Sequence, residues 1–263
     1  MDRLTIIKVG GAIVEQQDTL SLLLNDFSAV HGAKMLVHGG GRAATRMAER
    51  LGVGTQMVNG RRITSADMLD VVTMVYAGLV NKNIVAQLQA RRVQALGLTG
   101  ADADIIRSHR RPPVAIAGDT VDFGFVGDVD RCDGSRLAGL LRQDIVPVVA
   151  PITHDGQGSL LNTNADTIAS TVATALAPFY DVSLVYCFER PGVLRQPDDD
   201  SSVIPHIRKR DFPHLVDAGI VSGGMIPKIE NALAACSEGV REVYITRVDQ
   251  INRKDLGTRI SLD

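Results

Sequence analysis

Apolar residues follow two patterns along the chain, short continuous runs and a helical spacing. The strands and helices that these patterns predict alternate. Short apolar or β-branched runs predict buried strands at 4–9, 34–38, 93–98, 145–152, 182–188, 241–246 and 257–262. Between them, apolar residues fall on one helical face, as Leu20, Leu23, Leu24 and Phe27 do. Asp18 or Thr19 would cap that helix. Strands that alternate with helices are typical of right-handed βαβ units and a parallel sheet.

Glycine turns follow the first two strands. Lys8-Val9-Gly10-Gly11 ends one apolar run, and His38-Gly39-Gly40-Gly41 ends the next. Glycines leave backbone N–H groups unshielded, and ligands of open α/β sheets bind at the carboxyl ends of the strands. A phosphate beside Lys8 is therefore the leading candidate ligand, although this stretch taken alone favours a solvated lysine before an ordinary turn. His38 is more typical of a structural hydrogen bond than of catalysis.

The second glycine turn also fits another function. Gly39-Gly40-Gly41-Arg42-Ala43-Ala44 has the G-x-G-x-x-A form of a dinucleotide fingerprint, and Arg61 and Arg62 lie about twenty residues further on. A nicotinamide-dependent reductase is therefore an alternative hypothesis. The pattern follows the second strand rather than the first, however, and it leaves Lys8 without a role.

A hairpin and a long helix come next. Asn59-Gly60 between two apolar pairs is typical of a two-residue hairpin turn. Arg61 and Arg62 after it would either form paired hydrogen bonds with a carboxylate or stay exposed. Ser65 begins an amphipathic helix that runs to about Arg92 and faces either solvent or a second subunit.

The segment 100–133 consists of short pieces separated by proline and glycine, which predicts β-hairpins on the substrate side. Asp102 and Asp104 fit a surface loop better than a metal site.

Two asparagines and an aspartate form the next informative group. Strand alternation through Leu161-Asn162-Thr163-Asn164 puts Asn162 and Asn164 on the same side. Asn164 can cap the following helix, whose first turn contains Asp166. Capping alone accounts for Asn164 and Asp166, but it does not explain Asn162.

The carboxyl-terminal third contains a further turn and a second lysine. A strand at 182–188 leads into Glu189-Arg190-Pro191-Gly192-Val193-Leu194, a connection suited to one edge of a nucleotide. After Gly223-Gly224, Pro227 fits the first turn of a helix, so Lys228 lies at its amino end. A lysine there opposes the helix dipole unless an anion binds between them.

Composition restricts the classes of partner. The 263 residues are 45% hydrophobic and 22% charged, with a net charge of -2, so nothing favours nucleic acid or an anionic membrane. Three widely spaced cysteines fit a reducing compartment and have no metal-ligand spacing. Because we see neither a signal peptide nor an apolar run of membrane-spanning length, we expect a cytoplasmic protein. We also expect no resident metal.

Five motifs together resemble the amino acid kinase family, in order and over nearly the whole chain. They are Lys8-Val9-Gly10-Gly11, His38-Gly39-Gly40-Gly41, Asn59-Gly60-Arg61-Arg62-Ile63-Thr64, Leu161-Asn162-Thr163-Asn164-Ala165-Asp166 and Gly224-Met225-Ile226-Pro227-Lys228. Within the family, the chain is most similar to the enzymes that use ATP to phosphorylate the γ-carboxylate of N-acetyl-L-glutamate in arginine biosynthesis. The Walker-type phosphate loop and the protein-kinase H-R-D and D-F-G motifs do not occur.

The resemblance implies a role for each matching position. Lys8 and Lys228 would stabilise the transferring phosphoryl group, and Asp166 would orient them. Substrate contacts are implied for Gly40, Gly41, Arg62 and Asn162. Nucleotide contacts are implied for Gly10, Gly11, Glu189, Arg190, Pro191, Gly192, Val193, Leu194, Ile220, Val221 and Ser222. The cofactors would be ATP and Mg²⁺, the latter held mainly by phosphates and water.

The implied fold is a three-layer αβα sandwich with a mainly parallel open central sheet, in one domain. Residues 1–178 would bind the acyl-amino acid and residues 179–263 the nucleotide. Family members of this length are typically homodimers that are insensitive to arginine.

The chain departs from the family pattern before the nucleotide loop. Phe188, Glu189 and Arg190 stand where a small hydroxyl residue and an aspartate are usual. A non-catalytic regulatory relative is therefore one alternative. Related pathways use N-succinyl-L-glutamate, which makes an N-succinyl-L-glutamate kinase a second alternative.

Overall fold

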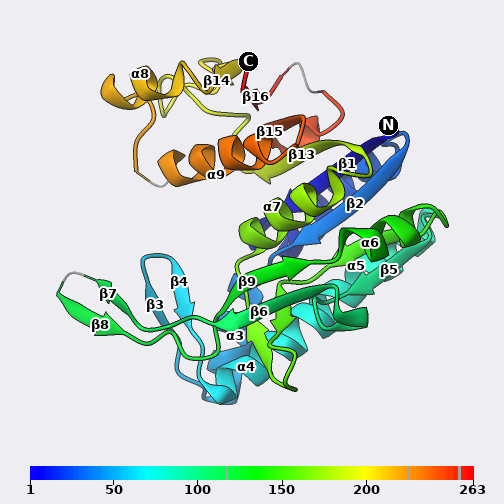
Figure 1. The fold of residues 1–263 in the computed structure, drawn as a ribbon, viewed down its shortest axis with the longest axis vertical. Helices are drawn as coiled ribbons and strands as arrows, with labels where there is room; N and C mark the ends of the chain where they lie inside the picture. Colours follow the sequence, from blue (N-terminus) through cyan, green and yellow to red (C-terminus); the bar gives the residue numbers. More distant parts are fainter. Residues whose placement is uncertain (117, 224, 254–255) are drawn as a thin grey trace.

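An eight-stranded sheet crosses the molecule in the order β14-β16-β15-β13-β1-β2-β10-β5 (Figure 1). The computed structural model describes residues 1–263 except 117, 224 and 254–255, so Gly224 of the predicted glycine pair lies outside the described residues. The sheet strands are β1 (Arg3–Val9), β2 (Ala33–His38), β5 (Ala95–Leu98), β10 (Val146–Val149), β13 (Asp181–Phe188), β14 (His206–Arg208), β15 (Glu242–Arg247) and β16 (Thr258–Ser261). All pairs from β15 to β5 are parallel, and only β16 runs antiparallel to its neighbour β15. The predicted mainly parallel sheet is confirmed.

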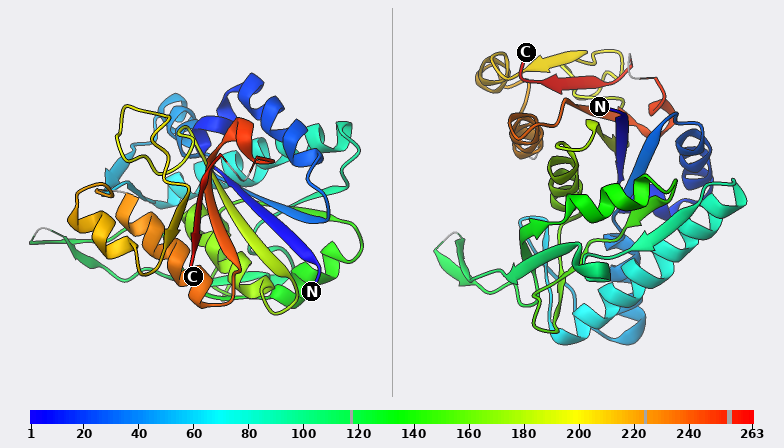
Figure 2. Two further views of the ribbon diagram at one scale, coloured as in Figure 1. Left: turned by 90° about the horizontal axis from the view of Figure 1, so that it is seen from above. Right: turned by 45° about the vertical axis from the view of Figure 1, so that its right-hand side comes forward.

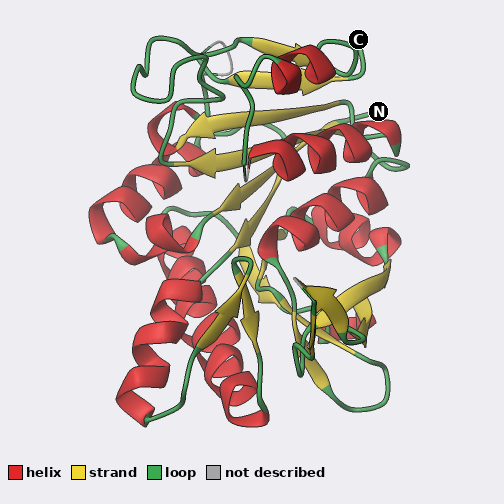
Figure 3. Cartoon of the chain, turned by 90° about the vertical axis from the view of Figure 1, so that its left-hand side faces the viewer, coloured by secondary structure: helices red, strands yellow, loops and turns green. Residues whose placement is uncertain are grey.

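Helices cover both faces of this sheet, as Figure 3 and the view from above in Figure 2 show. One face carries α1 (Gly11–Glu15), α2 (Gln17–Ser28), α3 (Gly41–Leu51), α4 (Ala66–Val72), the π-helix η1 (Thr73–Val80) and α5 (Asn81–Ala90). The other carries α6 (Gly134–Leu141), α7 (Ala165–Leu176), α8 (Phe212–Asp217) and α9 (Met225–Ser237). The predicted αβα sandwich is therefore confirmed.

Strand β1 shows how the sequence builds two cores at once. Its side chains alternate, so Leu4 and Ile6 enter the core under α7, while Ile7 and Val9 enter the core under α2. All four are fully buried, and each such side chain contributes roughly 1.5–3 kcal/mol to folding. Lys8 continues the face of Leu4 and Ile6, so it reaches the end of the sheet beneath α7.

Strand β1 is the point at which the strand order of the sheet switches. The chain adds β2, β5 and β10 on one side of β1, and it later adds β13 to β16 on the other. Strand β2 pairs with one side of β1, and β13 pairs with the other. The carboxyl ends of these three strands lie together, and loops that leave such a switch point in opposite directions open a crevice between them. The glycine turns after β1 and β2 and the segment after β13 surround this crevice.

Smaller sheets extend from the first half of the molecule. A four-stranded sheet contains β12 (Leu160–Asn162), β11 (Ile152–His154), β6 (Ile106–Arg110) and β9 (Gly127–Cys132). The hairpin of β3 (Gln56–Val58) and β4 (Arg61–Ile63) turns at Asn59 and Gly60, whose φ values of 48° and 74° fit the predicted two-residue turn. The hairpin of β7 (Val114–Ile116) and β8 (Asp119–Val121) projects from the molecule (Figure 1). The short helices η2 (Asp102–Asp104) and η3 (Val248–Gln250) complete the elements.

Two local predictions were wrong. Helix α2 begins at Gln17 directly after α1, with Gln16 rather than Asp18 or Thr19 at its N-cap. The predicted strand at 145–152 divides at Pro151, because β10 stays in the main sheet while β11 joins the smaller one. Helix α3 buries Ala44 and Ala48 and leaves Leu51 exposed, since small side chains let it pack closely against α1 and α4.

The long helix predicted from Ser65 is present, and the Ser65 hydroxyl accepts a hydrogen bond from the N–H of Met68. Contrary to our expectation, the span Ala66–Ala90 is long and apolar enough to cross a membrane by length and composition alone. In this fold, many of its apolar residues are buried in the core of the protein. Met68, Val72, Ile84 and Leu88 are among those that pack into the core beneath the sheet.

Candidate active site

Lys8 and Asp166 form an ion pair at the carboxyl end of β1. The Nζ atom of Lys8 lies 2.6 Å from Oδ1 of Asp166. Asp166 is held in the first turn of α7 because the Asn164 side chain caps that helix, accepting hydrogen bonds from the N–H groups of Asp166 and Thr167. The predicted cap is confirmed. Lys8 is only 6% exposed, so its charge needs this counter-ion.

Lys228 reaches the same place from the first turns of α9. Its Nζ lies 4.0 Å from the ring centroid of Phe188, and the Nζ of Lys8 lies 5.7 Å from the same centroid. Burial lowers the pKa of Lys228, Asp166 partly opposes this, and Lys8 adds to it. Two cations from opposite ends of the sequence therefore converge beside one carboxylate.

The two glycine turns are in direct contact. A Cβ on Gly11 would lie 3.2 Å from the backbone nitrogen of Gly41, and a Cβ on Gly39 would lie 3.2 Å from that of Gly11. Any larger residue would separate the turns. Their close packing brings several backbone N–H groups to one place, next to the lysines, and this arrangement suits an anion.

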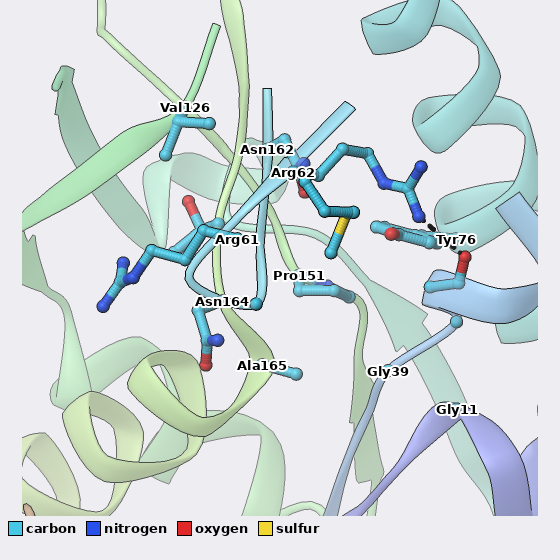
Figure 4. A pocket seen from close by; sticks show the side chains of 15 residues that line it. Gly11, Gly39, Arg61, Arg62, Tyr76, Val126, Pro151, Asn162, Asn164 and Ala165 are labelled. Carbon is cyan, nitrogen blue, oxygen red and sulfur yellow. Dashed lines mark hydrogen bonds between the residues drawn. The ribbon is translucent and has the colours of Figure 1, made fainter. Parts of the chain in front are cut away.

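A cavity of about 200 Å³ opens on one side of the glycine turns (Figure 4). All four predicted substrate contacts line it, namely Gly40, Gly41, Arg62 and Asn162. Arg62 is buried, and its guanidinium donates hydrogen bonds to Gly41 O at 2.9 Å and to Thr45 Oγ1 at 2.8 Å. The amide of Asn162 donates to Thr64 Oγ1 at 3.0 Å. These bonds hold both side chains in place without filling the cavity.

Arg61 lines the same cavity and differs from Arg62. Figure 4 shows the two guanidinium groups pointing in opposite directions. Within the described part of the chain, the Arg61 guanidinium makes no hydrogen bond. Burial lowers its pKa, as does the neighbouring Arg111, while Asp128 opposes the shift. The far end of the cavity therefore carries a positive charge that is available to a ligand.

Tyr76 is a cavity residue that the sequence prediction missed. It lies in the π-helix η1, and its ring packs so closely beneath Gly40 that a Cβ there would lie 2.8 Å from Cδ1. Burial raises the pKa of its hydroxyl, which Arg62 partly offsets. In the sequence, the available signal was a tyrosine within the apolar stripe of the predicted helix. The π-helical turn is visible only in the structure, and such turns often mark functional sites.

His38 supports the glycine turn from below. It is fully buried, with Nδ1 2.8 Å from Gly39 O and Nε2 3.1 Å from the side-chain nitrogen of Asn81. Because Gly39 O can only accept, Nδ1 donates, and Nε2 then accepts from Asn81. Burial lowers the pKa of His38 to about 4, so the ring is neutral near pH 7. This geometry fits the predicted structural role.

A second cavity, of about 710 Å³, opens on the other side of the glycine turns. Its lining includes Phe188, Lys228 and five of the predicted nucleotide contacts, namely Gly10, Gly11, Glu189, Arg190 and Gly192. Gly11, Gly41 and Gly60 line both cavities, so the two meet at these glycines. The lysine pair lies beside this junction.

The remaining predicted nucleotide contacts do not line this cavity. They are Pro191, Val193, Leu194, Ile220, Val221 and Ser222. Val193 and Val221 are buried in the core beneath α9, and the N–H of Val193 donates to Thr258 Oγ1. The Val193 and Val221 side chains therefore support the loops from inside rather than facing the cavity.

Carboxylates outside the lysine site are mostly used by neighbouring cations. Asp104 pairs with Arg107, Arg131 and His154. Among the described residues, no group of three or more histidine, cysteine, aspartate or glutamate side chains is placed to hold a metal ion.

Comparisons with known proteins agree with this geometry. The model of the amino acid kinase family matches residues 3–247. The chain belongs to this family. An acetylglutamate kinase of Phocaeicola vulgatus is 61% identical over 251 residues, which cover 95% of this chain and 96% of the relative. An acetylglutamate kinase of Bacteroides fragilis is 59% identical over 98% of this chain and 97% of its own.

Solved structures extend the agreement to the whole fold. The crystal structure of smu.665 from Streptococcus mutans UA159 has a TM-score of 0.76 and 30% identity, and the match covers 99% of each chain. Amino acid kinase membership therefore rests on both sequence and fold.

Proposed function

We propose that this protein uses ATP to phosphorylate the γ-carboxylate of N-acetyl-L-glutamate, forming an acyl phosphate in arginine biosynthesis. Relatives named acetylglutamate kinase, at 59–61% identity over nearly the full chain, support this substrate. One observation carries the proposal. Lys8, Asp166 and Lys228 converge beside the junction of a small cavity and a larger one. Family membership also favours a kinase over the reductase hypothesis.

The chemistry needs charge neutralisation rather than a general base. A γ-carboxylate has a pKa of about 4, so it is already an anionic nucleophile at neutral pH. The obstacle is its repulsion from the triphosphate, and the transition state spreads negative charge over the transferred oxygens. Lys8 and Lys228 stabilise that charge, the glycine N–H groups add preorganised donors, and Asp166 holds Lys8 in place.

The two cavities take different ligands. The smaller holds the acyl-amino acid, with Gly40, Gly41 and Asn162 as contacts and Arg62 at its α-carboxylate. The larger takes ATP, whose phosphates approach the first glycine turn while its nucleoside lies along the Glu189–Gly192 segment. Residues 1–178 thus form a lobe for the acyl-amino acid and 179–263 a lobe for the nucleotide, within one domain.

Mg²⁺ accompanies the nucleotide. Mg²⁺ retains waters and is commonly bound through substrate phosphates, with only one or two protein carboxylates. Asp166 is already paired with Lys8, so we expect phosphates and water to hold the ion. Bound there, it would neutralise part of the triphosphate charge.

N-succinyl-L-glutamate is a second candidate substrate, and Arg61 is the observation that favours it. An N-succinyl group ends in a carboxylate that an N-acetyl group lacks. Arg61 lines the cavity with no hydrogen-bonding partner among the described residues, and it points away from Arg62 (Figure 4). A guanidinium in that position suits a second carboxylate.

A non-catalytic, regulatory protein is the remaining alternative, and it rested on Phe188, Glu189 and Arg190. Glu189 and Arg190 line the larger cavity, and the Phe188 ring lies next to both lysines without separating them. This arrangement favours catalysis.

We also propose a cytoplasmic homodimer. The long helix Ala66–Ala90 exposes Met74 and Leu79 by 54% and 50%, and the edge strand β5 exposes Leu96 by 39%. Exposed apolar side chains on adjacent elements are typical of a subunit interface. Sedimentation equilibrium of the purified protein, compared with a Met74→Glu/Leu79→Glu variant, tests the dimer and this interface.

Turnover with competing substrates tests the function directly. ADP release is measured with N-acetyl-L-glutamate, N-succinyl-L-glutamate and L-glutamate at equal concentrations, and the acyl phosphate is trapped with hydroxylamine as a hydroxamate. We expect hydroxamate from an N-acylated glutamate and little from free glutamate. Tight binding of acylglutamates and Mg-ATP without ADP release would instead identify a regulator.

A further inference from the structure

Phe188 is placed where it contacts both lysines of the site. It is the last residue of β13, and strand alternation puts it on the same face as Tyr186, whose ring lies beside it with centroids 6.2 Å apart and planes 19° apart. Lys8 is in register with Tyr186 on the neighbouring strand. The Phe188 ring is therefore one step further along the sheet, within reach of Lys8 and of Lys228 at the start of α9.

The two lysines are stabilised unequally. Lys8 has a counter-ion, because Asp166 lies 2.6 Å from its Nζ. Among the described residues, no carboxylate lies within ion-pair distance of the Lys228 Nζ, whose pKa is lowered by burial. Its close neighbour is the Phe188 ring, 4.0 Å from Nζ to centroid. The negative face of an aromatic ring attracts an ammonium group, and this attraction grows as the site loses water.

We propose that Phe188 is a positioning residue for phosphoryl transfer, whose ring holds the Lys228 ammonium group at the junction of the two cavities. This role rests on the proposed kinase function. A small hydroxyl side chain at position 188 would leave the ammonium without this contact, and a long flexible lysine would then lose several rotamers on reaching the site. The ring limits that freedom before substrates bind, so the cation is preorganised for the charge that develops on the phosphoryl oxygens.

The structural alternative is that Phe188 only fills space at the end of β13. A graded change in ring electronics separates the two roles, because fluorine weakens the negative face of the ring while nearly preserving its shape. We would replace Phe188 with 4-fluoro-, 3,5-difluoro- and 3,4,5-trifluorophenylalanine and measure kcat and both KM values. We expect kcat to fall stepwise with each fluorine, to a loss of about five- to thirtyfold, and KM for the acyl-amino acid to stay constant.

Replacements of Phe188 by standard amino acids supply matched comparisons. Phe188→Leu removes the ring and should lose kcat to the same extent as the trifluoro variant, while Phe188→Tyr retains the ring and should restore most of the activity. Phe179→Leu, an exposed phenylalanine after α7, is the control and should behave as the wild type. A constant kcat across the fluorinated series would overturn the proposal, and so would a rise in the KM for ATP with unchanged kcat, which would indicate a nucleotide contact.

A spectroscopic measurement tests the contact without relying on activity. Reductive methylation with ¹³C-formaldehyde places methyl groups on lysine Nζ atoms, and comparison with Lys228→Arg assigns the signal of Lys228. Because these methyls lie over the ring, their signal should be shifted upfield in the wild type and in Phe188→Tyr, and the shift should vanish in Phe188→Leu. An unshifted wild-type signal would overturn the proposal.

The two arms separate failure of this inference from failure of the kinase function. If the wild type transfers no phosphate to any acylglutamate, the proposed function fails, whatever the methyl signal shows. If it does transfer phosphate but kcat is constant across the fluorinated series, only the role of Phe188 fails.

Discussion

The Nζ atom of Lys8 and the Oδ1 atom of Asp166 lie 2.6 Å apart, although the residues are separated by more than half of the chain. The pair joins β1 to the first turn of α7, and β1 leads directly into the glycine turn whose Gly11 lines both cavities. Lys228 reaches the same point from the carboxyl-terminal end of the protein. The proposed chemistry depends on this convergence, and the predictions below test its parts separately.

Lys8→Ala should reduce kcat by about a hundred- to a thousandfold, because removal of one preorganised donor to a developing anion typically has an effect of this size. KM for N-acetyl-L-glutamate should change little, since Lys8 does not line the smaller cavity. Steady-state ADP release measures both constants. Lys209→Ala, at an exposed lysine, is the matched control and should have no effect. A loss confined to KM would contradict the role of Lys8.

Asp166→Asn should lower both activity and stability, because it leaves the buried Lys8 ammonium without its counter-ion. We expect a decrease of about 1–3 kcal/mol in the free energy of unfolding, measured with urea. In the double variant Lys8→Met/Asp166→Asn, stability should largely recover while activity stays low. If the double variant were as unstable as the sum of the two single variants, the ion pair would not account for the loss.

Gly40→Ala should disturb the glycine turn, because the new Cβ would lie 2.8 Å from the Tyr76 ring. We expect a loss of about 1–3 kcal/mol in unfolding free energy and a higher KM for the acyl-amino acid. Gly139→Ala in α6 is the control, since a Cβ there meets nothing within 4 Å and alanine favours helix. If Gly40→Ala/Tyr76→Leu does not restore stability, the clash with Tyr76 is not the cause.

His38 should make folding sensitive to mild acid. Its pKa is lowered by burial to about 4 in the folded protein, against 6.5 as the reference value, so the unfolded chain binds the extra proton between these values. Above pH 6.5, His38 is neutral in both the folded and the unfolded protein, so the free energy of unfolding keeps its full value. It decreases as the pH falls towards 4, by about 3 kcal/mol at most.

Urea unfolding of the wild type and His38→Gln at several values between pH 4.5 and 7.5 measures this effect. The stability difference between the two proteins should narrow as the pH falls. His31→Gln, at an exposed histidine, should retain the wild-type pH dependence. A difference that is independent of pH would show that His38 does not titrate in this range.

Arg61→Met should discriminate between the two candidate substrates. The variant loses the cation that has no hydrogen-bonding partner among the described residues, while Arg62 and its bonds to Gly41 and Thr45 remain. We expect kcat/KM for N-succinyl-L-glutamate to fall by roughly ten- to a hundredfold, as for loss of a charge-assisted bond of about 1.5–3 kcal/mol. N-acetyl-L-glutamate should be used as before. Equal losses for both substrates would exclude Arg61 as a selector of the acyl group.

Local patterns in the sequence predicted much of this protein. The buried strand β1, the Asn59-Gly60 hairpin and the Asn164 cap each depend on residues within a few positions of one another, and all three are confirmed. The glycine turns and the two lysines were also visible, because glycine next to a buried strand and lysine at a helix amino end are unusual enough to indicate an anion.

Tertiary structure alone decided how these parts meet. No local pattern says that Lys8 and Lys228 share the Phe188 ring, that Tyr76 packs beneath Gly40, or that Arg61 and Arg62 point apart. These relationships depend on the order of strands in the sheet and on the packing of helices from distant parts of the chain. Secondary structure follows from short-range sterics and periodicity, whereas a site built at a switch point follows from long-range contacts.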